Sequence, residues 1–126
     1  VRPHDRDAST AQTLGLQRFG AISRTQTGAS QIWMGYATLS PGSRTDVHHH
    51  GESETGVYII SGIARWVLGE ALDVVVEAQP GDFVFIPPNV LHYEENASEV
   101  ESVEMIVSRS SDEAIVINRT DTPRGG

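Results

Sequence analysis

The chain has 126 residues, no cysteine and a formal charge of −8, from 17 acidic and nine basic residues. This length fits a single domain, since domains commonly contain about 100–150 residues, and the lack of thiols excludes disulfides and thiolate metal sites. The negative charge disfavours nucleic acid and anionic membranes as partners. No apolar run is long enough for a membrane span, and none resembles a signal peptide, so we expect a cytoplasmic protein.

Residues 1–13 are polar and show no hydrophobic periodicity. We expect them to form a flexible N-terminal arm, which can also cross onto a neighbouring subunit. At the other end, residues 119–126 are polar and finish with two glycines. We expect this segment to be a loose tail.

From Phe19 onward, short runs rich in β-branched and aromatic residues alternate with Gly, Pro and Asn, a pattern typical of strands and turns. The runs predict strands at 31–39, 57–60, 63–68, 74–77, 83–86, 92–95, 100–108 and 114–118. Gly62 separates two of these runs, so we expect a hairpin there. No apolar repeat at helical spacing is sustained after residue 30. The pattern therefore indicates an all-β sandwich or barrel.

A histidine-rich segment, residues 47–54 with the sequence VHHHGESE, lies between two of these strands. Side chains alternate between the faces of a strand, so His48 and His50 project to the same side about 6.6 Å apart. Two imidazoles at this spacing can bind one metal ion. Glu54, just past a glycine turn, can reach the same ion, and His92 from a distant segment can complete the set.

Two motifs resemble those of the cupin superfamily. The first, G-x5-H-x-H-x3,4-E-x6-G, is matched by Gly42, His48, His50 and Glu54, but seven residues instead of six then precede Gly62. We interpret the extra residue as a bulge or a longer turn. The second motif, G-x5-P-x-G-x2-H-x3-N, is matched by Gly81, Pro87, His92 and Asn96. Asn89 replaces its second glycine, a mild change because Asn tolerates the left-handed region.

The resemblance implies one cupin domain over residues 1–126, with its core at 30–108, folded as a double-stranded β-helix, or jelly-roll, barrel. It also implies a homodimer and one divalent metal per chain, held by His48, His50, Glu54 and His92. The ligand set suits Fe, Mn, Ni, Co, Cu or Zn.

Three neighbouring residues leave alternatives open. His49 should point to the face opposite His48 and His50, either behind the ligands or on the surface. Glu52 competes with Glu54 for the role of the carboxylate ligand because of the extra residue before Gly62. Glu94 shares the parity of His92, so it faces either the metal or, past a twist, the solvent.

A site of this kind predicts a small metal-dependent enzyme that acts on an oxygen-bearing substrate, as an oxygenase or as an isomerase or lyase. The alternative is a non-catalytic module that binds a metal or a small ligand. Arg44 and Arg65 are the cations expected nearby, each as a surface residue, which favours a neutral or carbonyl-bearing substrate. Seven aromatic residues can line the barrel mouth or, as we expect, pack in the core: Trp33, Tyr36, Tyr58, Trp66, Phe83, Phe85 and Tyr93.

Overall fold

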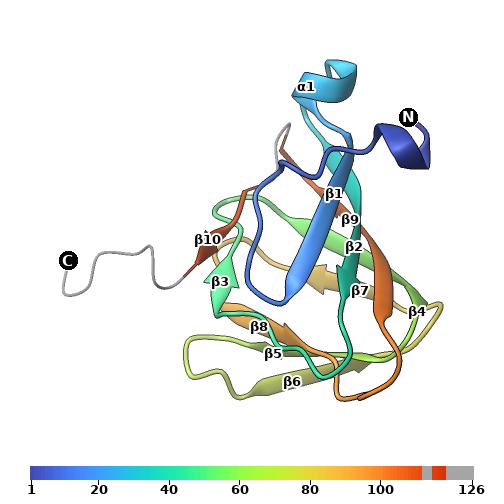
Figure 1. Ribbon diagram of the computed structural model, residues 1–126. Helices are drawn as coiled ribbons and strands as arrows, with labels where there is room; N and C mark the ends of the chain where they lie inside the picture. Colours follow the sequence, from blue (N-terminus) through green and yellow to red (C-terminus); the bar gives the residue numbers. More distant parts are fainter. Residues whose placement is uncertain (112–114, 119–126) are drawn as a thin grey trace.

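The structure is a computed structural model that describes residues 1–111 and 115–118 (Figure 1). The helical elements are η1 (Pro3–Asp5) and α1 (Arg24–Thr27). The strands are β1 (Leu16–Ile22), β2 (Trp33–Leu39), β3 (His48–His49), β4 (Thr55–Ser61), β5 (Ala64–Leu68), β6 (Val74–Ala78), β7 (Phe83–Ile86), β8 (His92–Glu95), β9 (Val103–Arg109) and β10 (Ile117–Asn118). Within the described residues, no helix is long and apolar enough to cross a membrane.

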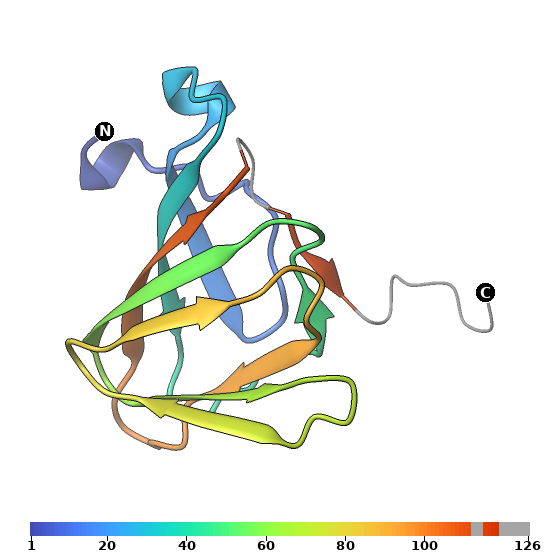
Figure 2. The same ribbon diagram turned by 180° about the vertical axis from the view of Figure 1, so that it is seen from behind.

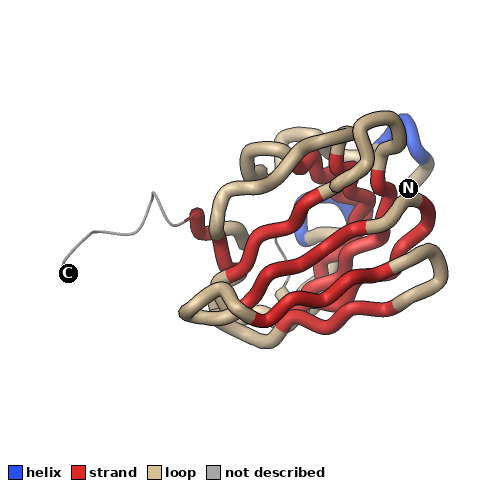
Figure 3. The backbone as a smooth tube through the Cα atoms, turned by 90° about the horizontal axis from the view of Figure 1, so that it is seen from below, coloured by secondary structure: helices blue, strands red, loops and turns tan. Residues whose placement is uncertain are grey.

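The strands form two antiparallel five-stranded sheets that face each other as a jelly-roll barrel (Figures 1 and 2). We call the sheet with the strand order β1-β2-β9-β4-β7 the large sheet. The sheet with the order β10-β3-β8-β5-β6 is called the small sheet. Seen from below, the strands run side by side and the loops gather at their ends (Figure 3). The expected all-β jelly-roll fold is therefore confirmed.

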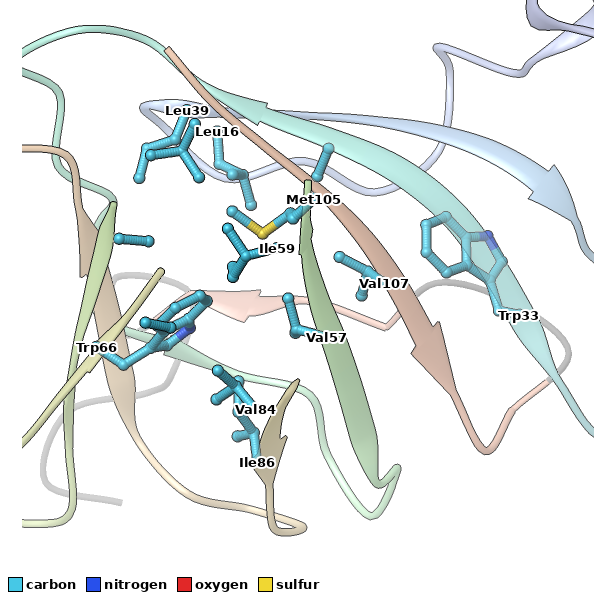
Figure 4. Close-up of a cluster of buried hydrophobic side chains, with 14 residues drawn as sticks. Leu16, Trp33, Leu39, Val57, Ile59, Trp66, Val84, Ile86, Met105 and Val107 are labelled. Carbon is cyan, nitrogen blue, oxygen red and sulfur yellow. The ribbon is translucent and has the colours of Figure 1, made fainter. Parts of the chain in front are cut away.

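Strict alternation along the strands builds the barrel interior. Burial in β9 switches at every residue, with Val103, Met105 and Val107 inside, and β4 alternates in the same way through Val57 and Ile59. These side chains meet Trp66 of β5 in one apolar cluster (Figure 4). Burial of aliphatic and aromatic side chains is worth about 1.5–3 kcal/mol each, so the cluster holds the sheets together.

The prediction of a hairpin around Gly62 is wrong, because the strands on either side of this glycine belong to different sheets. β4 pairs with β7 and β9, whereas β5 pairs with β6 and β8. Gly62 has a φ of 81°, and a Cβ there would lie 2.6 Å from the carbonyl oxygen of Ser102. The glycine therefore allows the chain to cross from one sheet to the other where a side chain does not fit.

The N-terminal segment lies against the outside of the large sheet. Asp7 and Gly20 exchange two backbone hydrogen bonds of 2.8 Å. The guanidinium of Arg6 lies over the rings of Phe19 and Tyr36, at 5.3 and 4.6 Å from their centroids. These contacts join residues 1–13 to β1 and β2 of the same chain.

The predicted strands lie within a few residues of the observed ones, apart from differences at the two ends of the chain. The first strand begins at Leu16, three residues before the first residue assigned to the strand region, and the α1 turn follows it. The last strand, expected at 114–118, is observed at Ile117–Asn118, and its expected start at Ala114 lies outside the described residues. The expected tail at 119–126 also lies outside them.

Candidate metal centre

Three imidazoles converge inside the barrel, on strands that the fold brings side by side. His48 of β3 is the register partner of His92 of β8. Thr45 secures this pairing, because its N–H donates to the carbonyl of Glu94 and its Oγ1 accepts from the Glu94 N–H, at 2.9 and 3.0 Å. His50 lies two residues beyond His48 on the same face. One nitrogen from each of the three rings lies within 4.8 Å of the other two.

Hydrogen bonds to the backbone fix the direction of each ring. Nδ1 of His48 lies 2.8 Å from the carbonyl oxygen of Asp46. The corresponding distances are 2.7 Å from Nδ1 of His50 to the carbonyl of Ile115 and 2.9 Å from Nδ1 of His92 to that of Val90. A carbonyl oxygen can only accept a hydrogen bond, so each Nδ1 carries a proton. Each Nε2 therefore presents its lone pair to the interior, which is the tautomer that a metal-binding histidine needs.

A carboxylate faces the same point, and it belongs to Glu94 of β8. Its Oε1 lies 3.4 Å from Nε2 of His92 and 3.8 Å from Nε2 of His48. The side chain is buried, and Oε2 has no hydrogen-bond partner. Of the two orientations left open for Glu94, the structure shows the inward one.

Glu54 does not join the three histidines. Its side chain is exposed between the buried Ser53 and Thr55, so strand alternation turns it away from the interior. The interval to Gly62 explains the misassignment, because six residues separate Gly62 from Thr55 and not from Glu54. Thr55 thus occupies the position of the motif carboxylate, and its Oγ1 is buried without a hydrogen-bond partner.

The electrostatics of the cluster fit a bound cation. Burial, partly opposed by Glu94, lowers the pKa of His48 to about 4. Burial and the charge of Arg109 hold the pKa of His50 far below its usual value. Burial alone would raise the pKa of Glu94, but its contact with His92 and the positive groups around it hold it well below the usual range.

The ring of His48, neutral because of its lowered pKa, faces an ionised carboxylate, and Nε2 of both His48 and His92 lacks a hydrogen-bond partner. A lone pair and a carboxylate repel each other unless a positive charge lies between them. The donor set of imidazole nitrogens and one carboxylate suits a divalent transition metal.

Two arginines that the sequence analysis missed also point into the barrel. Arg18 of β1 is 0% exposed and Arg109 of β9 is 3% exposed. Nη2 of Arg109 lies 3.3 Å from Nε2 of His50. Burial lowers the pKa of Arg18 to about 10 and, together with the charge of Arg18, that of Arg109 to about 9. Both guanidinium groups therefore stay charged at neutral pH.

A signal for these arginines was present in the sequence. Arg18 has the parity of the buried Leu16, and Arg109 continues the buried series Val103, Met105 and Val107. A charged residue in phase with core positions indicates an inward side chain.

The other residues considered in the sequence analysis lie outside the cluster. His49 is half-buried and accepts a hydrogen bond from the Gly51 N–H at Nδ1, and Glu52 is exposed. Arg65 pairs with Glu95 at 3.0 Å, and Arg44 stacks on Tyr93. Of the seven aromatic residues, the two tryptophans are buried in the interior, whereas Tyr58, Phe83 and Phe85 are exposed.

Comparisons with known proteins agree with the fold. A family model described as the cupin domain matches residues 35–108. Protein SchB of Streptomyces halstedii is 33% identical over 81 residues, which cover 64% of this chain and 56% of SchB. The chain thus matches little more than half the length of this curated relative.

Two solved structures share the architecture at low identity. The polyketide cyclase RemF from Streptomyces resistomycificus has a TM-score of 0.74 at 22% identity, over 94% of this chain and 83% of RemF. Oxalate decarboxylase from Bacillus subtilis also has a TM-score of 0.74 at 22% identity, over 88% of this chain and 29% of that chain. At this identity the likeness concerns the fold alone.

Proposed function

Because this chain belongs to the cupin domain family, we propose that it is a small metal-dependent enzyme with an oxygen-bearing substrate. The proposed ligands of one divalent ion are His48, His50 and His92, and the proposed carboxylate is Glu94 in place of Glu54. The observation that carries the proposal is the convergence of three buried nitrogens within 4.8 Å while each ring is fixed from behind by a backbone carbonyl.

A divalent ion at such a centre polarises a carbonyl or hydroxyl oxygen of a substrate. The protein supplies the remaining parts. The histidines and Glu94 are buried away from water, which strengthens electrostatic interactions around the reacting group. Glu94 Oε2, which has no hydrogen-bond partner, can accept a hydrogen bond from a hydroxyl of a substrate held beside the histidines.

The reaction that we propose is of the oxygenase or of the isomerase/lyase type. Two proteins that share the fold are named as a polyketide cyclase and an oxalate decarboxylase. Both names denote enzymes of oxygen-rich substrates, which supports this substrate class. The metal is one of Fe, Mn, Ni, Co, Cu or Zn, since all of them accept imidazole and carboxylate ligands.

Metal analysis of the purified protein tests the proposal. We expect about one equivalent of a divalent transition metal per chain by inductively coupled plasma mass spectrometry. Oxygen consumption in the presence of Fe would select the oxygenase type, whereas turnover without oxygen would select the isomerase/lyase type. Binding of a small ligand without any turnover would favour a binding module instead.

Variants of the histidines make the test specific. His50→Ala and His92→Ala should each lose most of the metal, because each removes a ligand while the apolar cluster remains. His49→Ala is the matched control, since its ring lies outside the cluster and should leave the metal content unchanged. Equal metal content in all three variants would contradict the proposed ligands.

We also propose that the enzyme works as a homodimer through the outer face of the large sheet. A groove of about 400 Å³ on this face is lined by Met34, Tyr58, Phe83, Phe85 and neighbouring residues. Phe83 is 81% and Phe85 is 59% exposed. Exposed aromatic patches of this kind commonly mark interaction surfaces, and the same face of a second copy is a complementary partner.

A further inference from the structure

The barrel interior holds more positive than negative charge. Among the described residues, the buried charged side chains besides the histidines are Arg18, Arg109 and Glu94. Two guanidinium groups and one carboxylate leave an excess of one positive charge. A divalent ion at the histidines would increase this excess.

The guanidinium groups are also short of hydrogen-bond acceptors. Nε, Nη1 and Nη2 of Arg18 have no partner, nor do Nε and Nη1 of Arg109. Within the described part of the chain, the contact of Arg109 Nη2 with His50 is the single hydrogen bond that either guanidinium makes. Burying an ion whose donors lack acceptors costs several kcal/mol, and a ligand that supplies acceptors would offset this cost.

We propose that Arg18 and Arg109 form the receptor for a carboxylate group of the substrate, next to the histidine cluster. A guanidinium presents its donors in a planar fork that matches the two oxygens of a carboxylate. One carboxylate also balances the single excess charge. The substrate class is therefore a small carboxylic acid that carries a further carbonyl or hydroxyl oxygen.

Arg109 couples this receptor to the metal centre. Its Nη2 donates to the lone pair of His50 Nε2, at 3.3 Å, which is the lone pair that a metal ion needs. An ion that takes this lone pair removes the acceptor of Nη2 and leaves another N–H donor for the carboxylate. Metal and carboxylate should therefore bind cooperatively, each increasing the affinity for the other.

Thr55 of β4 lies beside this receptor, because it is the register partner of Arg109 on β9. Its hydroxyl is buried and has no hydrogen-bond partner. The Thr55 hydroxyl is therefore a further interior donor next to Arg109.

Thermal unfolding of metal-free protein tests the receptor directly. The probes are acetate and benzoate, and the controls are acetamide and benzamide, which have the same shape without the charge. At saturating concentration and constant ionic strength, at least one of the carboxylates should raise Tm by roughly 2–5 °C. The amides should leave Tm unchanged, and equal shifts with acids and amides would overturn the proposal.

Arginine variants separate a binding role from a structural one. Arg18→Met should lose the carboxylate-dependent shift and yet raise the Tm of the ligand-free protein by roughly 2–5 °C, because it removes an unpaired buried charge. Arg44→Met, at an exposed arginine, is the control that should keep the shift. A lower ligand-free Tm in Arg18→Met, or a shift that survives in it, would contradict the receptor.

This proposal rests on the proposed function only for the reaction that the bound acid undergoes, and the two can fail separately. If the protein binds metal but carboxylates do not raise its Tm, the receptor is rejected and the metal centre stands. If carboxylates raise the Tm of a protein that binds no metal, the metal centre is rejected and the receptor stands. In protein loaded with Mn²⁺, the affinity for benzoate should rise, and an unchanged affinity would reject the coupling through Arg109.

Discussion

The three interior histidines are held by atoms that the sequence pattern does not reveal, namely the carbonyls of Asp46, Val90 and Ile115. Two of these carbonyls lie only two residues before the ring that they bind. A ring fixed in this way needs little reorientation on binding a metal, so less conformational entropy is lost. The backbone thus prepares the site before any ion arrives.

The two candidate carboxylates can be distinguished by substitution. Glu94→Gln should lower the metal affinity by about 10–100-fold or more, because the buried carboxylate beside His48 and His92 is lost. Glu54→Gln should leave the affinity unchanged, because its side chain is exposed. Isothermal titration with Zn²⁺ measures both values. A larger loss in Glu54→Gln would restore the carboxylate assigned from the sequence.

A residue on the outer face predicts a pH effect at the alkaline end. The Tyr36 hydroxyl donates to Glu104, and burial together with this hydrogen bond raises the pKa of Tyr36 from 10.0 to about 12. The folded state then holds the proton more tightly than the unfolded state does. The contribution of Tyr36 to stability should be complete below about pH 10 and should be lost as the pH rises to about 12.

Ultraviolet titration of the three tyrosines measures this effect. One phenol should ionise near pH 12, and Tyr36→Phe should remove that step. Tyr58→Phe is the control and should keep it. If the ionisation near pH 12 survives in Tyr36→Phe, the step does not belong to Tyr36, and its hydrogen bond to Glu104 is not its cause.

At the scale of elements, the crossing from β4 to β5 decides whether the two sheets close into a barrel. Gly62 makes this crossing with a φ of 81°, and a Cβ would meet the backbone of Ser102 and Val103 at 2.6 and 2.9 Å. Backbone cannot move aside as a flexible side chain can. The position therefore tolerates glycine alone.

Gly62→Ala should lower the free energy of unfolding by about 2–5 kcal/mol, the sum of left-handed strain and a steric clash. Gly28→Ala is a matched control, since Gly28 has a φ of 77° but no atom within 4 Å of its Cβ position. It should lose only about 1–2 kcal/mol. Urea unfolding measures both, and equal losses would mean that the backbone near Gly62 adapts.

For the molecule as a whole, the proposed dimer makes a prediction about the outer face. Size-exclusion chromatography with light scattering should give twice the mass of one chain. Phe85→Glu should shift the population to monomers, because it places a charge in the apolar groove. Glu70→Lys is the control and should leave the mass unchanged. It changes the charge of an exposed turn residue next to the small sheet, away from the proposed interface. A monomeric wild-type protein would contradict the dimer.

Much of this protein followed from the sequence by itself. Alternating apolar residues and glycine–proline turns determined an all-β barrel, since period-two patterns fit only strands. The spacing of His48 and His50 and the second motif around His92 indicated three residues that the structure brings together. Asn89 adopts a φ of 60°, as expected from its place in the second motif.

Only the tertiary structure decided which strands pair and which charges meet. The crossing at Gly62, the inward turn of Glu94 and the burial of Arg18 and Arg109 in one barrel depend on contacts between segments that lie far apart along the chain. Local pattern specifies the face of a strand on which a side chain lies, but not the strand opposite. Because the two sheets are closed by contacts between distant segments, the charge inside the barrel is a property of the fold.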